Sequence, residues 1–320
     1  MPSAENCYPS MIAVCIATYN HELFIAQAIE SVLAQQCDEP LRIYIGDDAS
    51  TDGTSAVCKR YATQDERMVY IRREENLGLV DNTIDLYRRI MADECEYIAM
   101  LDGDDYWTDP NKLQMQVDYL RAHPEVGFVH TNGSTLSGAS TWTFGQRDGV
   151  YGIDSVGFAN CTVLFRTNLL SDNLLDDIAQ QHFMWLDYPL YGVFYQLIKW
   201  VYLPKETAVW RDHISVSQPQ TAEAILRLRE ERCRMWKWLD GHFPGQVGYS
   251  EQEAKNYLYE QRLNLIYQFD DQTLVTSSLL YDYKPASWKQ KLKLKGLKNS
   301  TIYTILQKTL KKFARIKKKL

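Results

Sequence analysis

The chain has 320 residues, a formal net charge of −6, and a composition of 45% apolar and 24% charged residues, which predicts a globular protein of one large or two small domains. Its first residues lack the basic and apolar regions of a signal peptide, and no run of about 18 apolar residues predicts a membrane-spanning helix. Seven cysteines without a CxxC pair argue against a disulfide framework and favour a reducing, cytosolic compartment.

Short apolar segments alternate with segments of helical spacing along the first 122 residues. Buried strands are expected at residues 11–17, 41–45, 68–71 and 97–101. Helices are expected at residues 21–36, 54–62, 79–91 and 110–122. This alternation predicts a parallel sheet with helices on both faces, in which ligands bind beyond the carboxyl ends of the strands.

The pattern is less regular after residue 122. Strands are expected at residues 126–130, 161–165, 201–203 and 207–210, with loops or an irregular hairpin over 131–157. Helices are expected at residues 174–185, 221–239 and 251–269. We therefore predict three parts: an α/β domain at 1–215, a helical segment at 216–285 and a basic tail at 286–320.

Three carboxylates follow the fourth expected strand. The apolar residues 97–101 end at the sequence Asp-Gly-Asp-Asp, residues 102–105, which lies at one edge of the sheet. These charges repel one another unless a cation compensates, and hard divalent ions prefer oxygen ligands and also bind diphosphates. The sequence predicts a metal and nucleotide site, with an ordinary acidic turn as the alternative. An EF-hand calcium loop is excluded, because its Gly and Glu positions hold Trp107 and Leu113.

Several short motifs occur in a fixed order along the first 215 residues. They are ATYN at 17–20, DDASTDGT at 47–54, NLG at 76–78, DGDDYW at 102–107, Asp187, and WRDH at 210–213. This ordered set resembles the family 2 glycosyltransferases of the GT-A fold over about two thirds of the chain. The resemblance implies an α/β fold with a GT-A-like, Rossmann-type, mostly parallel sheet flanked by helices, followed here by a C-terminal helical segment. It also implies a divalent cofactor, Mn²⁺ or Mg²⁺.

The resemblance assigns donor-binding roles to residues at the strand ends. It implies that Tyr19 stacks on the nucleobase and that Asp48 accepts the imide N–H of uracil, which would favour a UDP-sugar. Asn76 and Gly78 are expected close to the donor, and Asp102 is expected to reach the ribose or a metal-bound water. The alternatives are a core position for Tyr19, a turn-forming role for Asp48 and a helix cap at residues 76–78.

The same resemblance names residues for the metal, the phosphates and the acceptor. Asp104 and His213 are expected to bind the divalent ion, and Arg211 is expected to pair with phosphate. Asp105 and Trp107 are expected to face the acceptor sugar or to stabilise the loop. A packed core position is the alternative for the tryptophan.

The resemblance implies sugar transfer with direct inversion at the anomeric carbon, which needs a general base on the acceptor side. The resemblance places this base at Asp187, in the sequence WLDYP, and Asp176 and Asp177 are the fallback bases. An N-cap before a helix that begins at Pro189 is the alternative for the first of these aspartates.

The C-terminal end is strongly basic. Residues 288–320 contain twelve Lys or Arg and no Asp or Glu, so the remainder carries 35 − 12 = 23 basic against 41 acidic residues. The apolar spacing of residues 300–320 predicts an amphipathic helix that lies on an anionic membrane surface. The alternative is docking on the acidic body of the protein. Nucleic acid is disfavoured, because the tail lacks interleaved aromatic residues and the body would repel phosphate.

These observations predict an inverting glycosyltransferase that transfers a sugar from a nucleotide-diphosphate sugar to a glycan or lipid-linked acceptor. The expected setting is surface polysaccharide biosynthesis, with the protein cytoplasmic and peripheral on the cytoplasmic face of the cell membrane. The alternative is a catalytically silent nucleotide-sugar-binding or assembly subunit at the membrane. A nucleotidyltransferase is a weaker interpretation, because residues 18–21, Thr-Tyr-Asn-His, stand where a Gly-rich phosphate loop is expected.

Overall fold

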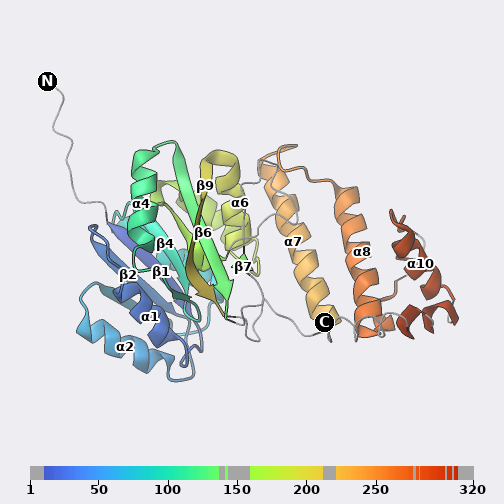
Figure 1. The fold of residues 1–320 in the computed structure, drawn as a ribbon, viewed down its shortest axis with the longest axis horizontal. Coiled ribbons are helices and arrows are strands. Elements are labelled where there is room, and N and C mark those ends of the chain that lie inside the picture. Colours follow the sequence, from blue (N-terminus) through green and yellow to red (C-terminus); the bar gives the residue numbers. More distant parts are fainter. Residues whose placement is uncertain are drawn as a thin grey trace. The chain divides into compact units, whose positions relative to one another are not determined.

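The computed structural model describes residues 11–136, 141–142, 159–211, 221–276, 279–280, 282–299, 301–304 and 306–308. The chain forms two compact units, Met1–Asp212 and His213–Leu320 (Figure 1). The first unit contains the sheet and the second contains helices. The three-part division made from the sequence stays a prediction.

The first unit is built on a nine-stranded sheet. Its strands are β1 Ile12–Thr18, β2 Leu41–Asp47, β3 Met68–Arg72, β4 Tyr97–Asp102, β5 Tyr106–Trp107, β6 Val126–Thr135, β7 Thr141–Trp142, β8 Val163–Arg166 and β9 Lys199–Trp210. Their order is β3-β2-β1-β4-β8-β6-β9-β5, with β7 paired to β6. The first four of these are parallel, and β8 runs antiparallel between β4 and β6. The predicted α/β fold with a mostly parallel sheet is confirmed.

Helices cover both faces of this sheet (Figure 1). They are α1 Ile25–Leu33, α2 Thr54–Gln64, α3 Leu79–Ala92, α4 Lys112–Ala122, α5 Asp172–Gln180 and α6 Asp187–Leu197, with short 3-10 turns at Asn160–Thr162 and Thr167–Leu169. On one face, apolar side chains of α1 and α4 bury against alternate residues of β1 and β4. On the other face, Tyr87 of α3 and Phe194 of α6 pack on Phe165 of β8, with ring centroids 6.0 and 5.2 Å apart.

Two strand predictions in the second half of the sheet were wrong in extent. β6 continues to Thr135, where loops were expected, and the two expected edge strands form one strand, β9. The long parallel pairing of β6 with β9 explains both results, because each strand supplies the hydrogen-bond partners of the other. The register shifts between the pairs His130–Tyr202 and Asn132–Glu206, and Pro204 lies in this irregularity.

Three other element boundaries differ from the prediction. The first helix begins at Ile25 rather than at residue 21, because Asn20 has a φ of 56° and starts a turn. The helix expected over 174–185 ends at Gln180, shortly before His182, which has a φ of 50°. The strand expected at 161–165 begins only at Val163, after a 3-10 turn. A left-handed residue interrupts regular structure, and apolar spacing does not reveal it.

The second unit contains α7 Ala222–His242, α8 Glu251–Phe269, a 3-10 turn at Gln272–Leu274, and α10 Trp288–Leu297. The hydroxyls of Thr221, Ser250 and Ser287 each accept a backbone N–H at the start of α7, α8 and α10. Leu226, Leu263 and other apolar side chains of these helices form a core of their own. The predicted C-terminal helical segment is confirmed.

Membrane-spanning helices were not expected from the sequence. Within the described ranges, none of the helices combines the length and the apolar character needed to cross a bilayer. The longest apolar stretch, residues 189–204, is divided between the end of α6 and the start of β9.

Candidate active site

The ends of three parallel strands bring the predicted motifs together. Thr18, the last residue of β1, pairs with Asp47, the last residue of β2. On the other side of β1, Ala17 pairs with Asp102, the last residue of β4. The motifs that follow these strands therefore lie at one edge of the sheet, where ligands bind in open α/β sheets.

The acidic loop, residues 102–105, packs closely against the end of β1 at Gly103. Its backbone N–H donates to the carbonyl of Ala17 at 3.0 Å. A Cβ at this position would lie 2.6 Å from Oγ1 of Thr18 and 2.8 Å from Nδ1 of His21, which is too close for any side chain. The loop can approach β1 this closely only because the residue is glycine.

Asp104 faces a histidine that the sequence analysis did not assign to the site. Its Oδ2 lies 3.8 Å from Nε2 of His21, and each side chain is about one fifth exposed, 18% and 20% respectively. The imidazole is positioned by a hydrogen bond between its Nδ1 and the Thr18 hydroxyl at 3.2 Å, and the backbone N–H of His21 donates to Thr54. The signal that could have identified His21 is its place directly after the ATYN motif.

Asp102 is held by a pair of residues from later in the chain. Nδ2 of Asn160 lies 3.2 and 3.3 Å from the two carboxylate oxygens, and the hydroxyl of Tyr191 donates to Oδ1 of Asn160 at 2.6 Å. Burial and then the charge of Asp104 raise the pKa of Asp102 to about 7. The Asn160 amide lowers this pKa, whereas the charge of Asp187 raises it.

We expect Tyr191→Phe to move the acidic limb of the pH profile of sugar transfer to higher pH. Without the tyrosine hydroxyl the Asn160 amide is free to turn away, and the ionised form of Asp102 loses the Nδ2 donor that contacts both of its oxygens. The folded-state pKa of the carboxyl then rises further, so activity is lost at a higher pH as the solution is acidified. Tyr195→Phe, on the same helix, is the control. An unchanged acidic limb in Tyr191→Phe would contradict this role.

Asp187 is the first residue of α6, and its Oδ1 accepts the N–H of Tyr188 at 2.8 Å. Its charge raises the pKa of Asp102 and of Tyr87 in α3. The helix begins at this aspartate rather than at Pro189, so the carboxylate lies in the first turn. The fallback base Asp176 is 56% exposed and forms an ion pair with Arg88.

Asp48 organises the loop at the start of α3. It is almost fully buried, and its two carboxylate oxygens accept the N–H groups of Leu77 at 2.7 Å and Gly78 at 2.9 Å. Asn76 donates from Nδ2 to the Asp48 carbonyl at 3.1 Å. The φ of +87° at Gly78 favours glycine there. Beside this loop, the ring of Tyr19 is 43% exposed and free to contact a ligand.

Asp105 and Trp107 are buried beneath the acidic loop. The carboxylate of Asp105 is 1% exposed and accepts the N–H of Arg211 at 2.9 Å, and burial raises its pKa well above the usual range. The indole of Trp107 is 4% exposed, donates to the carbonyl of Cys161 at 2.8 Å, and carries the buried Lys112 ammonium 4.4 Å above its ring. Both roles predicted for this pair, facing the acceptor sugar and stabilising the loop, stay predictions.

The guanidinium of Arg211 lies between two aromatic rings. It is 5.0 Å from the ring centroid of Phe24 and 4.9 Å from that of Tyr106, and it also hydrogen-bonds to Gln27. In this position the side chain secures the end of β9 to the start of α1. The next predicted residue, His213, lies outside the described residues.

Among the described residues, no three or more His, Cys, Asp or Glu side chains converge as a preformed metal cluster. Asp104 presents a partly exposed carboxylate, and its charge raises the pKa of the neighbouring Asp102, so an added cation would relieve repulsion. This donor set fits a hard divalent ion that takes further oxygen ligands from a diphosphate.

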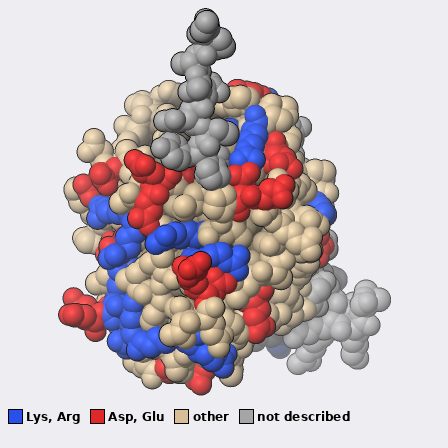
Figure 2. All heavy atoms as spheres, turned by 90° about the vertical axis from the view of Figure 1, so that its left-hand side faces the viewer, with Lys and Arg blue, Asp and Glu red and all other residues tan. Residues whose placement is uncertain are grey.

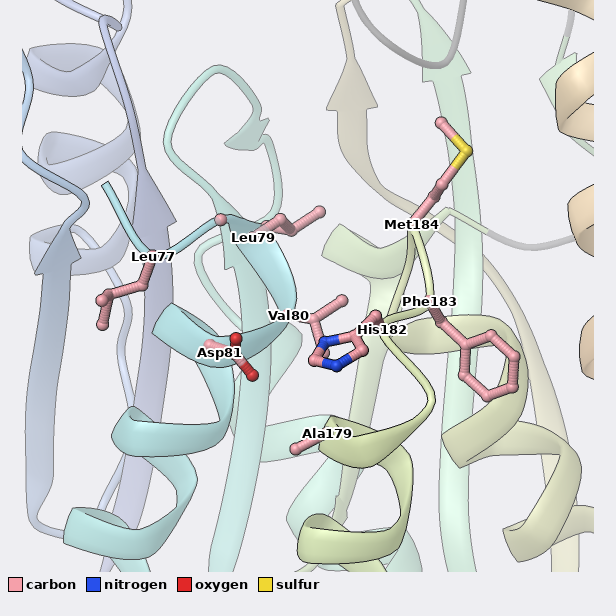
Figure 3. Close-up of a pocket in the computed structure, with 9 residues that line it drawn as sticks. Leu77, Leu79, Val80, Asp81, Ala179, His182, Phe183 and Met184 are labelled. Atoms are coloured by element: carbon pink, nitrogen blue, oxygen red, sulfur yellow. The ribbon is translucent and has the colours of Figure 1, made fainter. Parts of the chain in front are cut away.

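A cavity of about 270 Å³ adjoins the loop that Asp48 holds (Figure 3). Its walls come from the loop before α3, the start of α3, the end of α5 and the segment that follows α5. They are formed by Leu77, Gly78, Leu79, Val80, Asp81, Ala179, His182, Phe183 and Met184. Figure 3 shows the imidazole of His182 beside Val80, with the side chain of Phe183 directed away. The lining is mainly apolar.

Comparisons with known proteins agree with this geometry. The sequence model described as "Glycosyl transferase family 2" matches residues 13–186, more than half of the chain. The chain belongs to this family. An uncharacterized protein of Mycobacterium tuberculosis is 39% identical over 116 residues, which cover 36% of this chain and 33% of the relative. TuaG of Bacillus subtilis, named for teichuronic acid biosynthesis as a glycosyltransferase, is 31% identical over 110 residues, 34% of this chain and 42% of TuaG. The matched part of this family 2 chain therefore spans a third to under a half of these relatives.

Two solved structures share the fold of this family 2 member. Residues 1–349 of TarS from Staphylococcus aureus, in complex with UDP, match with a TM-score of 0.52 and 16% identity over 94% of this chain and 91% of that chain. The mannosyltransferase PcManGT from Pyrobaculum calidifontis, in complex with GDP-Man and Mn²⁺, matches with a TM-score of 0.52 and 16% identity over 94% and 85%. At these identities the likeness concerns the fold.

Proposed function

We propose that the protein is an inverting glycosyltransferase that transfers a sugar from a UDP-sugar to a glycan or lipid-linked acceptor. The observation that carries the proposal is the position of Asp48, Asp102 and Asp104 at the ends of neighbouring parallel strands in a family 2 chain. A role in surface polysaccharide biosynthesis at the cytoplasmic face of the membrane follows from the name of TuaG and from the basic C-terminal end.

The donor is proposed to bind along the ends of β1 and β2. The exposed ring of Tyr19 offers a stacking surface for the nucleobase. Asp48 uses one lone pair on each oxygen for Leu77 and Gly78, and the remaining lone pairs can accept the uracil imide N–H. The UDP bound to TarS supports a nucleotide-sugar donor of this kind. Arg211 stays a proposed phosphate ligand.

The diphosphate is proposed to lie over the acidic loop. Asp104 would hold a Mn²⁺ or Mg²⁺ ion together with the diphosphate, with His213 as a further ligand and Asp102 directed at the ribose or a metal-bound water. Such an ion neutralises the charge that develops on the departing diphosphate. The Mn²⁺ bound to PcManGT supports a divalent cofactor.

The transfer step is proposed to be a direct displacement. The acceptor oxygen attacks the anomeric carbon as the carboxylate of Asp187 takes the hydroxyl proton. The bond from this carbon to the diphosphate oxygen breaks, and its electron pair leaves with the nucleoside diphosphate. Attack opposite the leaving group inverts the configuration.

Calorimetric titration of UDP into the protein, with and without Mn²⁺, tests the donor site. We expect Mn²⁺-dependent binding that is lost in Asp104→Ala, because that variant removes the proposed metal ligand. Failure of UDP to bind the wild-type protein with or without the ion would overturn the donor proposal. UDP binding without transfer from any UDP-sugar would instead favour a silent nucleotide-sugar-binding subunit.

A further inference from the structure

The rotation of α10 about its axis is fixed by its contacts with α8. A Cβ at Gly296 would lie 2.2 Å from the hydroxyl of Tyr267, so the two helices approach as closely as a glycine allows. The same hydroxyl donates to the carbonyl of Lys293 at 2.8 Å, and the Lys293 ammonium donates to Asn264 at 2.8 Å. The inner face of α10 is therefore determined, and so is the face directed away from the core.

The outer face of α10 carries an exposed tryptophan. Trp288 is 69% exposed and Leu292, one turn later, is 38% exposed. Lys289, Lys291 and Lys295 are exposed around them, and positions 288, 291, 292 and 295 share one side of the helix. A tryptophan is seldom this exposed in the absence of a partner surface.

The charge of this region has a single sign. From residue 283 to residue 320 the sequence contains Lys and Arg but no Asp or Glu. By contrast, the face of the molecule drawn in Figure 2 mixes acidic and basic side chains. The outer face of α10 therefore combines two exposed apolar side chains with exposed lysines of the same helix, a combination that complements an anionic surface with an apolar interior.

The first residues of the predicted amphipathic helix at 300–320 pack into the core of the second unit. Tyr303 is 7% exposed, and Leu306 packs against the same helical core. The apolar side chain of Leu306, which was expected to face the membrane, contributes to the core of the second unit. The rest of that helix, from residue 309, lies outside the described residues.

We propose that the outer face of α10 binds the surface of an anionic lipid bilayer. Trp288 and Leu292 enter the headgroup region, where the amphipathic indole ring is favoured, and the surrounding lysines contact anionic headgroups. This inference rests on the membrane location proposed above. It is independent of catalysis, because lipid binding and UDP binding are measured separately.

Co-sedimentation of the full chain with vesicles tests the surface. We expect binding to phosphatidylcholine vesicles that contain phosphatidylglycerol, and much weaker binding to phosphatidylcholine alone. The double variant Lys291→Gln/Lys295→Gln should lower the partition coefficient about 30-fold, since each basic residue contributes roughly a factor of five. Trp288→Ser should lower it by about 10-fold or more through the lost apolar contact, and Trp288→Phe should restore part of it.

The control variants distinguish the effect of this surface on vesicle binding from the effects of general charge and of misfolding. Lys59→Gln removes an exposed lysine of α2, and Leu197→Ser removes a leucine that is 59% exposed at the end of α6. Neither should alter vesicle binding, and all variants should keep the UDP affinity of the wild-type chain. Wild-type vesicle binding in both the double lysine variant and Trp288→Ser, or equal binding to neutral and anionic vesicles, would overturn the inference. The chain has eight tryptophans, so the fluorescence of Trp288 is taken as the difference between the wild-type protein and Trp288→Phe. A shift in this difference that depends on protein concentration but not on lipid would overturn the inference and assign the face to a second copy of the chain.

Discussion

Asp187→Asn is expected to lower the rate of sugar transfer by about 10²–10⁴-fold while UDP binding is retained. The amide oxygen of asparagine can still accept the N–H of Tyr188, a contact of 2.8 Å in the wild-type protein, so the start of α6 keeps its structure. The amide cannot take a proton from the acceptor hydroxyl at neutral pH. Single-turnover transfer rates with a UDP-sugar, together with calorimetric titration of UDP, measure the two effects separately.

Asp172→Asn is the matched control for this substitution. Asp172 also lies in the first turn of a helix, is 73% exposed and pairs with Arg88 of α3. We expect its transfer rate to equal that of the wild-type protein. Full activity in Asp187→Asn combined with lost activity in Asp176→Asn would move the general base to α5 and contradict the assignment.

The strand ends of the site were predictable because short apolar runs and turn residues are local signals. The run at 97–101 became β4, and the acidic residues after it fell beside the ends of β1 and β2 as a parallel sheet requires. Local patterns did not predict the different contacts of neighbouring residues. Asp47 is fully buried and binds Ser50 and Tyr70, whereas the adjacent Asp48 is directed at the loop before α3.

The supporting residues of the acidic loop could not be predicted, because they come from distant parts of the chain. Asn160 lies 58 residues after Asp102, and Tyr191 lies 31 residues after Asn160. Nothing in the sequence around either residue indicates a carboxylate partner. Their contacts depend on β8 inserting antiparallel between β4 and β6 and on α6 packing across that strand. Sequence periodicity specifies which face of an element is buried, but not which element buries it.

Gly103→Ala is expected to weaken UDP binding and to slow sugar transfer by about 10²-fold, the loss typical of a displacement near 1 Å at a catalytic site. The added methyl group would overlap Thr18 at 2.6 Å and His21 at 2.8 Å. Thr18 is the last residue of β1, and His21, in the turn after it, is held by Thr18 and Thr54. The acidic loop must therefore move outward, which displaces the carboxylates on either side of Gly103 from the positions that the donor requires. Calorimetry with UDP and steady-state transfer assays measure the effect.

Gly241→Ala tests whether the weaker UDP binding and slower transfer of Gly103→Ala come from the close approach to β1 rather than from the replacement of any glycine by alanine. A Cβ at Gly241, in α7, would meet no atom within 4 Å. This variant should keep full activity and gain slightly in thermal stability, because alanine restricts the unfolded chain. If Gly103→Ala binds UDP with wild-type affinity, the close contact with β1 is not what positions the acidic loop. If UDP binding by Gly103→Ala falls while its melting temperature stays that of the wild-type protein, the contact acts on the site and not on the fold.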